Sequence, residues 1–329
     1  MRAIAIVLTA LLAGTLAAEA RELRLGAAPP PASPWGVITQ KFVDRVAEVS
    51  GGELEIKAYM GGKLGAEQDV AKQIARGRID MGVMSNSAVS LLVPSFGLLT
   101  SPYAFDSAEQ FDCVADNHLL DTFGEEFDGA GIVTLSWMEV GYQSIFSQKD
   151  MRLPSDLAGV KIRTAPSVTD TLFIKEAGGT AVPLDPNDVI PAMKTGQVNA
   201  ATQLSVFGIV SSYDKVAPNI VLTRHQHQVG AIIMSKRTWN KLSDEEKGWI
   251  NEAAPVFLEL REAIRGAEVA LLKKVADEGA NVIELSNKEL DAWRALAPAA
   301  QKQILDELGG KAQAKWNAIL AAKSACTQN

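Results

Sequence analysis

The sequence is poor in the residues and motifs on which most enzymes depend. It contains 2 cysteines and 3 histidines in 329 residues, and it has no CxxC pair. The patterns GxSxG, GxxxxGK[ST], GxGxxG and HExxH do not occur. These patterns mark serine hydrolases, P-loop proteins, dinucleotide-binding folds and zinc proteases. The sequence therefore favours a binding protein over an enzyme and predicts no bound cofactor.

The three histidines do not predict a metal site. His118 lies on the polar face of a predicted helix, whereas His225 and His227 are two residues apart. The latter two can share one face of an extended segment, but a zinc site needs further placed ligands. We expect a surface position for His118, hydrogen-bonded structural roles for His225 and His227, and no metal.

The chain also lacks an excess of positive charge. Its formal net charge is −7, and no basic stripe is present. Nucleic acids and anionic membrane surfaces attract basic proteins, so neither is expected as a partner.

Long apolar runs are missing beyond the N-terminus. Met1-Arg2 is followed by the apolar residues 3–18 and by the small-x-small sequence Ala18-Glu19-Ala20. This order is typical of a secretory signal peptide, and the run is shorter than the ~20 residues of a membrane span. We predict a signal peptide over residues 1–20, cleavage after Ala20, and a soluble periplasmic protein that does not insert into the membrane.

The two cysteines leave one question open. Cys113 and Cys326 can form a disulfide in an oxidising compartment and tie the C-terminal segment to the body of the protein. Two free thiols are an equally valid interpretation of the sequence.

Alternating and amphipathic segments predict an α/β fold. Strands are expected over residues 23–28, 54–59 and 79–84, with helices over 34–49 and 66–76 between them. This β-α-β-α-β order indicates a parallel sheet covered by helices. Residues 86–99 are expected to be a loop, and two separate strands are expected over 131–137 and 142–147.

A second set of elements repeats the first. Residues 76–84 and 195–203 share a helix end, a glycine, a β-branched residue and then Asp or Asn at the start of a strand. The recurrence suggests two similar lobes.

A helical pattern over residues 244–278 begins with a capping box at Ser243 and contains Pro255. A kinked helix of this length is expected to span both lobes, and Gly309-Gly310 is expected to interrupt the C-terminal helices.

The most informative single residue is Arg163. It ends a predicted strand over residues 160–164, Pro166 stops that strand, and Ser167 can cap the next helix. Open α/β sheets bind ligands at such strand ends, and the planar guanidinium fork suits a carboxylate. A pairing of Arg163 with an acidic side chain of the protein is the alternative.

Several of these stretches together resemble the extracytoplasmic solute-binding proteins of TRAP transporters, the DctP-like family. The resemblance covers nearly all of the chain after the predicted signal peptide. It rests on five motifs: L-G-A-E at 64–67, G-R-I-D at 77–80, D-L-A-G-V-K-I-R at 156–163, M-K-T-G-Q-V-N at 193–199 and W-N-K-L-S at 239–243.

The resemblance implies a two-lobed periplasmic binding protein fold, with a helix-flanked β-sheet in each lobe, hinge strands and a long kinked helix across both. We expect lobe I to comprise residues 21–140 and 229–268, and lobe II residues 141–228 and 269–329. A monomer would capture a small organic acid between the lobes and deliver it to the membrane subunits of a TRAP permease. A ligand-sensing protein that feeds a membrane signalling receptor is the alternative function.

The resemblance also places candidate site residues. The family's carboxylate-binding arginine falls on Arg163. Gln143 stands where many members have a second arginine, and Gln203 stands where many have asparagine. Fewer positive charges favour a monocarboxylate as the ligand. Trp35 and Trp137 lie near predicted strand ends, and Ser85, Asn86 and Ser87 follow the third strand. Further candidates are Glu67, Phe207 and Tyr213.

Overall fold

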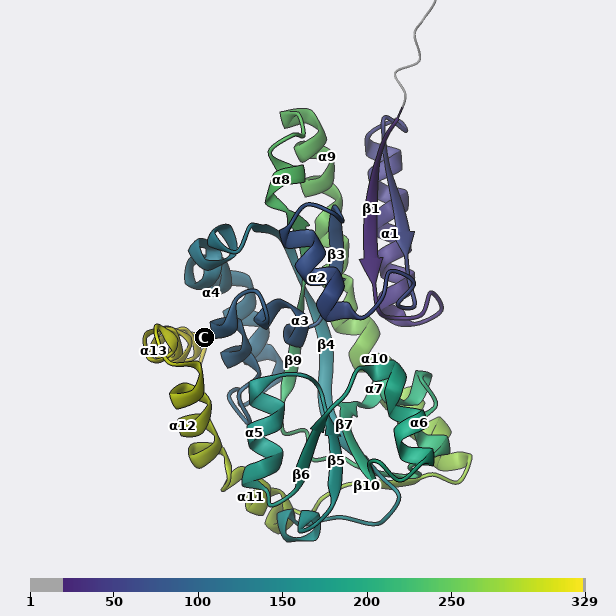
Figure 1. Ribbon diagram of the computed structural model, residues 1–329, viewed down its shortest axis with the longest axis vertical. Coiled ribbons are helices and arrows are strands. Elements are labelled where there is room, and N and C mark those ends of the chain that lie inside the picture. Colours follow the sequence, from purple (N-terminus) through teal and green to yellow (C-terminus); the bar gives the residue numbers. More distant parts are fainter. Residues whose placement is uncertain (1–19, 328–329) are drawn as a thin grey trace, which may run out of the picture.

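A sheet of ten strands organises the residues that this computed structural model describes, which are residues 20–327. The strand order is β2-β1-β3-β9-β4-β7-β5-β6, with β8 beside β4 and β10 beside β8. Figure 1 shows an upper lobe that contains β1 and β3 and a lower lobe that contains β5, β6 and β7. The predicted signal peptide lies outside the described residues, apart from Ala20.

Lobe I begins with the predicted β-α-β-α-β unit. The parallel strands β1 (Arg21–Ala27), β2 (Leu54–Tyr59) and β3 (Met81–Met84) are connected by α1 (Pro34–Val49) and α2 (Glu67–Ala75). Ser33 caps α1 by accepting a hydrogen bond from the amide of Gly36 at 3.2 Å. Phe42 and Val46 are fully buried against the sheet.

Lobe II repeats this unit with parallel strands of its own. They are β5 (Lys161–Thr164), β6 (Thr180–Pro183) and β7 (Ala200–Leu204), connected by α5 (Val168–Glu176) and α6 (Val189–Lys194). Gly77 after α2 and Gly196 after α6 both have φ of 73°, a conformation that favours glycine. The two glycines therefore mark equivalent turns, as the sequence predicted.

The lobes share one long strand, β4 (Ile132–Ser147). Its first part pairs with β9 (His227–Ser235) in lobe I, and its last residues pair with β7 and β8 (Asn219–Val221) in lobe II. The prediction of two separate strands was wrong, because a bulge between Glu139 and Gly141 lets the strand continue. Gly141 has a φ of 101° at this point.

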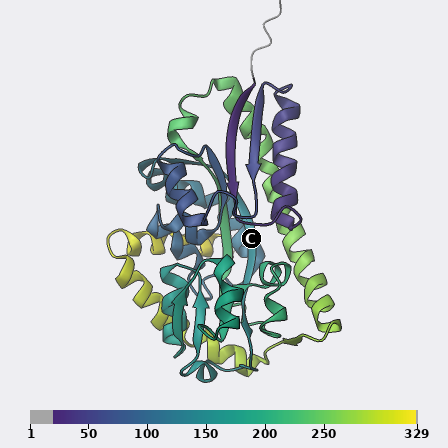
Figure 2. The ribbon, with the colours of Figure 1, turned by 45° about the vertical axis from the view of Figure 1, so that its right-hand side comes forward.

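The predicted long helix also connects the lobes. It consists of α9 (Asp244–Ala253), the 3₁₀ segment η5 (Ala254–Glu259) that contains Pro255, and α10 (Leu260–Asp277). Ile264 packs into the apolar core of lobe I, and Leu272 packs into that of lobe II. Figure 2 shows α10 running along the side of the molecule from one lobe to the other.

The C-terminal helices form a second connection. They are α11 (Asn287–Arg294), α12 (Ala297–Leu308) and α13 (Ala312–Ala325), with Gly309 and Gly310 at the predicted interruption. Helix α12 packs on α5, whereas α13 packs on α4 (Ala108–Gly129) of lobe I. Cys113 and Cys326 form a disulfide between α4 and the end of α13. We keep the predicted lobe boundaries as a proposal, except that we now assign α13 to lobe I.

One predicted loop is ordered and buried. Residues 86–99 include α3 (Asn86–Ser90), and they run into the 3₁₀ segment η1 (Pro94–Thr100). The expectation of a loop was wrong because Phe96, Leu98 and Leu99 pack fully inside lobe I.

Six short elements complete the fold: η2 (Pro154–Leu157), η3 (Pro186–Asp188), α7 (Ser205–Val210), η4 (Tyr213–Lys215), α8 (Lys236–Trp239) and β10 (Asn281–Ile283). Within residues 20–327, no helix has both the length and the apolar character that a membrane crossing requires.

Candidate ligand-binding site

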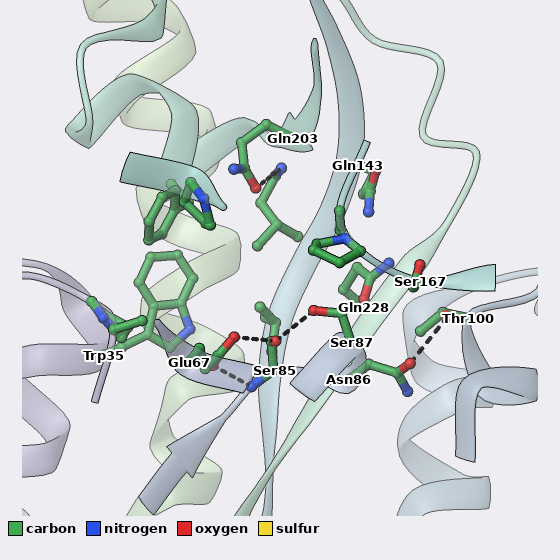
Figure 3. Close-up of a pocket in the computed structure, with 18 of the residues that line it drawn as sticks. Trp35, Glu67, Ser85, Asn86, Ser87, Thr100, Gln143, Ser167, Gln203 and Gln228 are labelled. Atoms are coloured by element: carbon green, nitrogen blue, oxygen red, sulfur yellow. Dashed lines mark hydrogen bonds between the residues drawn. The ribbon is translucent and has the colours of Figure 1, made fainter. Parts of the chain in front are cut away.

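A cavity of about 820 Å³, counted with its open mouth, lies between the lobes. Lobe I contributes the start of α1, the first turn of α2 and the turn from β3 into α3. Lobe II contributes the turn from β5 into α5 and the turn from β7 into α7. These turns follow the carboxyl ends of strands, where α/β sheets bind ligands. Figure 3 shows the side chains of this cavity.

Arg163 lies at the end of β5, lines the cavity and is only 2% exposed. Its Nε donates to the carbonyl of Leu184 at 3.0 Å, and its Nη1 donates to the carbonyl of Thr202 at 3.0 Å. Among residues 20–327, no carboxylate forms an ion pair with Arg163 within 4.0 Å. Two of its five N–H donors are used by these carbonyls, so the fork is fixed in place and keeps N–H groups for a ligand.

The wall from lobe I is a chain of polar side chains bonded to one another. The carboxylate of Glu67 accepts from the amide of Ser85 at 2.7 Å and from its hydroxyl at 2.6 Å. The hydroxyls of Ser85 and Ser87 lie 3.0 Å apart, as Figure 3 shows. Asn86 is buried, and its Nδ2 donates to the carbonyl of Phe96 at 3.0 Å.

The pKa of the Glu67 carboxyl group, on the wall from lobe I, is shifted by its surroundings. Burial raises the pKa of Glu67, and the nearby Asp185 carboxylate raises it further. The two hydrogen bonds from Ser85 oppose this increase because they stabilise the charged form. Burial has the largest effect, so the neutral acid is favoured relative to an exposed glutamate.

Trp35 and Phe207 form the apolar part of the cavity. Their ring centroids are 6.1 Å apart with an interplanar angle of 54°. Trp35 is 1% exposed, and its Nε1 donates to the carbonyl of Glu139 at 3.2 Å. The two aromatic side chains therefore provide a fixed surface for the apolar face of a ligand.

Both predicted glutamines line the cavity. Gln143 on β4 is 5% exposed, and its Nε2 donates to Asp170 at 3.2 Å. The Gln203 side-chain oxygen accepts from the amide of Leu204 at 2.9 Å.

The structure brings nine of the predicted residues to one cavity: Trp35, Glu67, Ser85, Asn86, Ser87, Gln143, Arg163, Gln203 and Phe207.

Two predicted residues lie elsewhere. Trp137 packs against Phe96 and Phe127 in the core of lobe I, with ring centroids 5.9 Å from each. Tyr213 lies behind Gln203 in the core of lobe II and donates its hydroxyl to the carbonyl of Pro186 at 2.8 Å. Both side chains are placed by packing, which the position of an aromatic residue near a strand end does not reveal.

The sequence analysis missed Thr100, Ser167 and Gln228 as cavity residues. Thr100 follows the segment that was expected to be a loop, so no pattern pointed to it. Ser167 was recognised only as a helix cap, and its hydroxyl does accept from the amide of Asp170 at 3.3 Å. Gln228 lies near the start of β9, opposite Gly141 of β4, in a pairing between strands that are distant in the sequence.

His225 and His227 take part in packing and hydrogen bonding. His225 stacks on Phe173 at 4.9 Å between ring centroids, and burial lowers the pKa of His225 to about 3. His227 lies 2.7 Å from the carboxylate of Glu139. Within the described chain, no group of three metal-ligating side chains lies close enough together to hold an ion.

Two α/β lobes, strands and a helix that cross between them, and a cavity with a fixed guanidinium define the class of periplasmic solute-binding proteins. The chain belongs to the family of bacterial extracellular solute-binding proteins, family 7 (DctP), which matches residues 25–307. This is the family of TRAP-transporter binding proteins that the sequence motifs indicated, and its members bind solutes rather than catalyse reactions.

Individual relatives are similar over most of the chain. A solute-binding protein of Chromohalobacter salexigens is 26% identical over 280 residues, which are 84% of this chain and 83% of that protein. A TRAP solute-binding protein of Sulfitobacter sp. NAS-14.1 with bound β-D-galacturonate has a TM-score of 0.85 and 25% identity, covering 90% of this chain and 99% of its own. One from Roseobacter denitrificans with bound β-D-glucuronate has a TM-score of 0.86 and 25% identity, covering 92% and 99%.

Proposed function

We propose that this protein captures a hydroxylated monocarboxylate, such as a hexuronate, in the cavity between its lobes and delivers it to a TRAP-type permease. The observation that carries the proposal is the charge of the cavity. Arg163 is the one cationic side chain among the described residues that line it, and Glu67 is the one acidic side chain. A ligand with one carboxylate can pair with Arg163, whereas a second carboxylate would have no cationic side chain in the cavity to pair with.

The rest of the cavity suits a ligand with hydroxyl groups. Hydroxyl and amide side chains on both walls can donate and accept hydrogen bonds, and the rings of Trp35 and Phe207 offer an apolar surface. Relatives of this chain hold β-D-galacturonate and β-D-glucuronate, which are monocarboxylates with several hydroxyl groups.

Capture would proceed by closure of the lobes. In an open state Arg163 is hydrated, and closure around the bound acid removes water and strengthens the ion pair. A ligand shifts the equilibrium towards closure only through its greater affinity for the closed form. We propose that the protein is exported by its signal peptide, with cleavage after Ala20, and acts as a monomer.

A thermal-shift screen tests the proposal. D-galacturonate, D-glucuronate, D-galactonate and succinate are compared at equal concentrations. A ligand at a hundredfold excess over its Kd stabilises the folded state by about 2.7 kcal/mol. We expect one or more of the sugar acids to raise the Tm, and succinate to have little effect. A response to succinate alone, or to none of the four acids, would contradict the proposed ligand class.

A further inference from the structure

We propose that Asp170 is a positioning residue that fixes the amide of Gln143 with its nitrogen towards the cavity. In this orientation Gln143 offers a carboxylate in the cavity an N–H donor and not a carbonyl acceptor. The inference deepens the proposed function, because it concerns how the same cavity recognises the acid group of its ligand.

Asp170 is buried behind the cavity wall at 1% exposure and lies in the first turn of α5. Three donors from three different segments meet at a single one of its oxygens, Oδ2. They are the Gln143 Nε2 on β4 at 3.2 Å, the amide of Ala165 at 3.0 Å and the hydroxyl of Thr202 on β7 at 3.4 Å. One carboxyl oxygen therefore connects the segments that carry Gln143 and Gln203 and the turn that follows Arg163.

The contact between Asp170 and Gln143 decides which end of the amide faces which way. A glutamine amide can rotate by 180° about its last torsion, which exchanges a donor for an acceptor. An oxygen of Asp170 that already accepts two other hydrogen bonds attracts the amide nitrogen and repels the amide oxygen. Figure 3 shows the nitrogen of Gln143 on the side nearer Ser167 and Gln228, with the oxygen on the far side.

The two atoms at the outer ends of this contact make the orientation costly, so the contact at Oδ2 must compensate for them. The Oε1 of Gln143 and the Oδ1 of Asp170 are buried and have no hydrogen-bond partner among the described residues. A buried acceptor without a donor destabilises the folded protein, so Gln143 would turn its oxygen elsewhere if the nitrogen were not held. The second N–H of Gln143 remains for the ligand, and Arg163 lines the same cavity.

The electrostatics of Asp170 fit this role. Burial raises the pKa of Asp170, while Arg163 on the neighbouring strand and the hydrogen bonds from Ala165, Gln143 and Thr202 oppose the increase. If Asp170 is protonated, Oδ1 can carry the proton, because no donor bonds to that oxygen. Either charge state leaves Oδ2 as the acceptor that holds Gln143.

The arrangement offers a matched pair of variants. Because all three donors meet at Oδ2, an Asp170→Asn variant can keep that oxygen as the acceptor. The substitution then replaces only Oδ1, the oxygen that has no hydrogen-bond partner. An Asp170→Ala variant removes the acceptor. Lys175→Ala is the control, because it changes an exposed side chain on the same helix and leaves every contact of Asp170 in place.

The first measurement is calorimetric binding of D-galacturonate to these variants, to Gln143→Ala and to the Asp170→Ala/Gln143→Ala double variant. The loss of one net hydrogen bond to a charged ligand corresponds to roughly a tenfold weaker Kd. We expect that loss for Asp170→Ala and for Gln143→Ala, no further loss in the double variant, and affinities near wild type for Asp170→Asn and Lys175→Ala. Losses that multiply in the double variant, or equal losses in the Asn and Ala variants, would overturn the proposal.

The second measurement does not depend on the ligand. The side-chain amide protons of Gln143 are followed by NMR in the ligand-free protein, with the exposed Gln313 as reference. We expect slow exchange with water in the wild type and in Asp170→Asn, and fast exchange in Asp170→Ala. Exchange in the wild type as fast as that of Gln313 would refute the positioning role. Slow exchange in a protein that does not bind D-galacturonate would instead refute the proposed ligand and leave the positioning role intact.

Discussion

The two walls of the cavity differ in how their polar groups are partnered. On the wall of lobe I, Glu67, Ser85 and Ser87 bond to one another. On the wall of lobe II, Arg163 is held from behind by the carbonyls of Leu184 and Thr202. It keeps N–H groups that no side chain of the described residues uses.

This difference suggests that the two lobes have different roles in ligand binding. A wall whose donors are fixed and unsatisfied is prepared for an anion, because little reorganisation is needed when the ligand arrives. A wall whose polar groups already bond to one another has fewer free donors for an anion, and it suits recognition of shape and hydroxyl groups. We infer that lobe II captures the carboxylate and that lobe I closes over the rest of the ligand.

The largest effect is expected from removing the cation of lobe II. Arg163→Ala should weaken binding of the acid found in the screen by tenfold or more, since truncating one partner of a buried ion pair costs about 2–5 kcal/mol. Arg163→Lys should also bind weakly, because an ammonium group does not reproduce the planar fork. Calorimetry measures both affinities, and Arg152→Ala, at an exposed arginine of the same lobe, is the control. Equal affinity in all three variants and the wild type would remove the distinction between the walls.

A change remote from both walls should alter stability and leave affinity unchanged. The disulfide between Cys113 and Cys326 joins residues 213 positions apart. Disulfides typically stabilise proteins by about 2–4 kcal/mol, chiefly by restricting the unfolded chain. We expect a lower Tm for the Cys113→Ser/Cys326→Ser variant in thermal unfolding. Because the disulfide lies away from the cavity, the Kd measured by calorimetry should stay within about twofold of wild type, far from the tenfold change that corresponds to about 1.4 kcal/mol. A large loss of affinity would show that the C-terminal helices act on the cavity.

A change on the wall of lobe I should affect stability more than binding. Asn86→Ala leaves the buried carbonyl of Phe96 without its donor, which costs about 1–3 kcal/mol of unfolding free energy. The affinity for the acid should fall by less than in Arg163→Ala. Denaturant unfolding and calorimetry on the same samples check this order. An affinity loss as large as that of Arg163→Ala would place an essential ligand contact on lobe I.

The smallest effect is expected from Glu67→Gln, and it should depend on pH. The pKa of Glu67 is raised in the folded protein, so between its unfolded and folded pKa values the folded state binds more protons than the unfolded state. The wild type therefore loses stability as the pH rises through this window, and glutamine, which does not titrate, does not. The Tm of the variant relative to wild type should be higher at pH 7 than at pH 4. A difference that does not change with pH would show that Glu67 titrates normally.

Much of this architecture follows from local patterns in the sequence. The repeated glycines Gly77 and Gly196, the capping serine Ser243 and the interruption at Gly309 are each specified by a few neighbouring residues, and all were predicted. The continuous strand β4 was not predicted, because its continuity depends on a bulge that is defined only by pairing with β9. The burial of η1 was missed for a similar reason, since its apolar residues pack against elements distant in sequence.

The cavity shows the same limit. Arg163 was found because it ends a predicted strand, and the glutamines were found because the family resemblance places them where many members have arginine and asparagine. Asp170 was not, because its role depends on Gln143, 27 positions earlier, and on Thr202, 32 positions later. Trp35 and Trp137 looked equivalent in the sequence, and only the packing of the folded chain separates the one that lines the cavity from the one in the core.

The most direct test of the central claim is a crystal structure of the protein with the acid identified by the screen. We predict that the carboxylate of the ligand lies between the lobes, with both oxygens about 2.7–2.9 Å from guanidinium nitrogens of Arg163, as in other charge-assisted pairs. A ligand whose carboxylate lies away from Arg163, or outside the cavity, would contradict the assignment of lobe II as the wall that captures the acid.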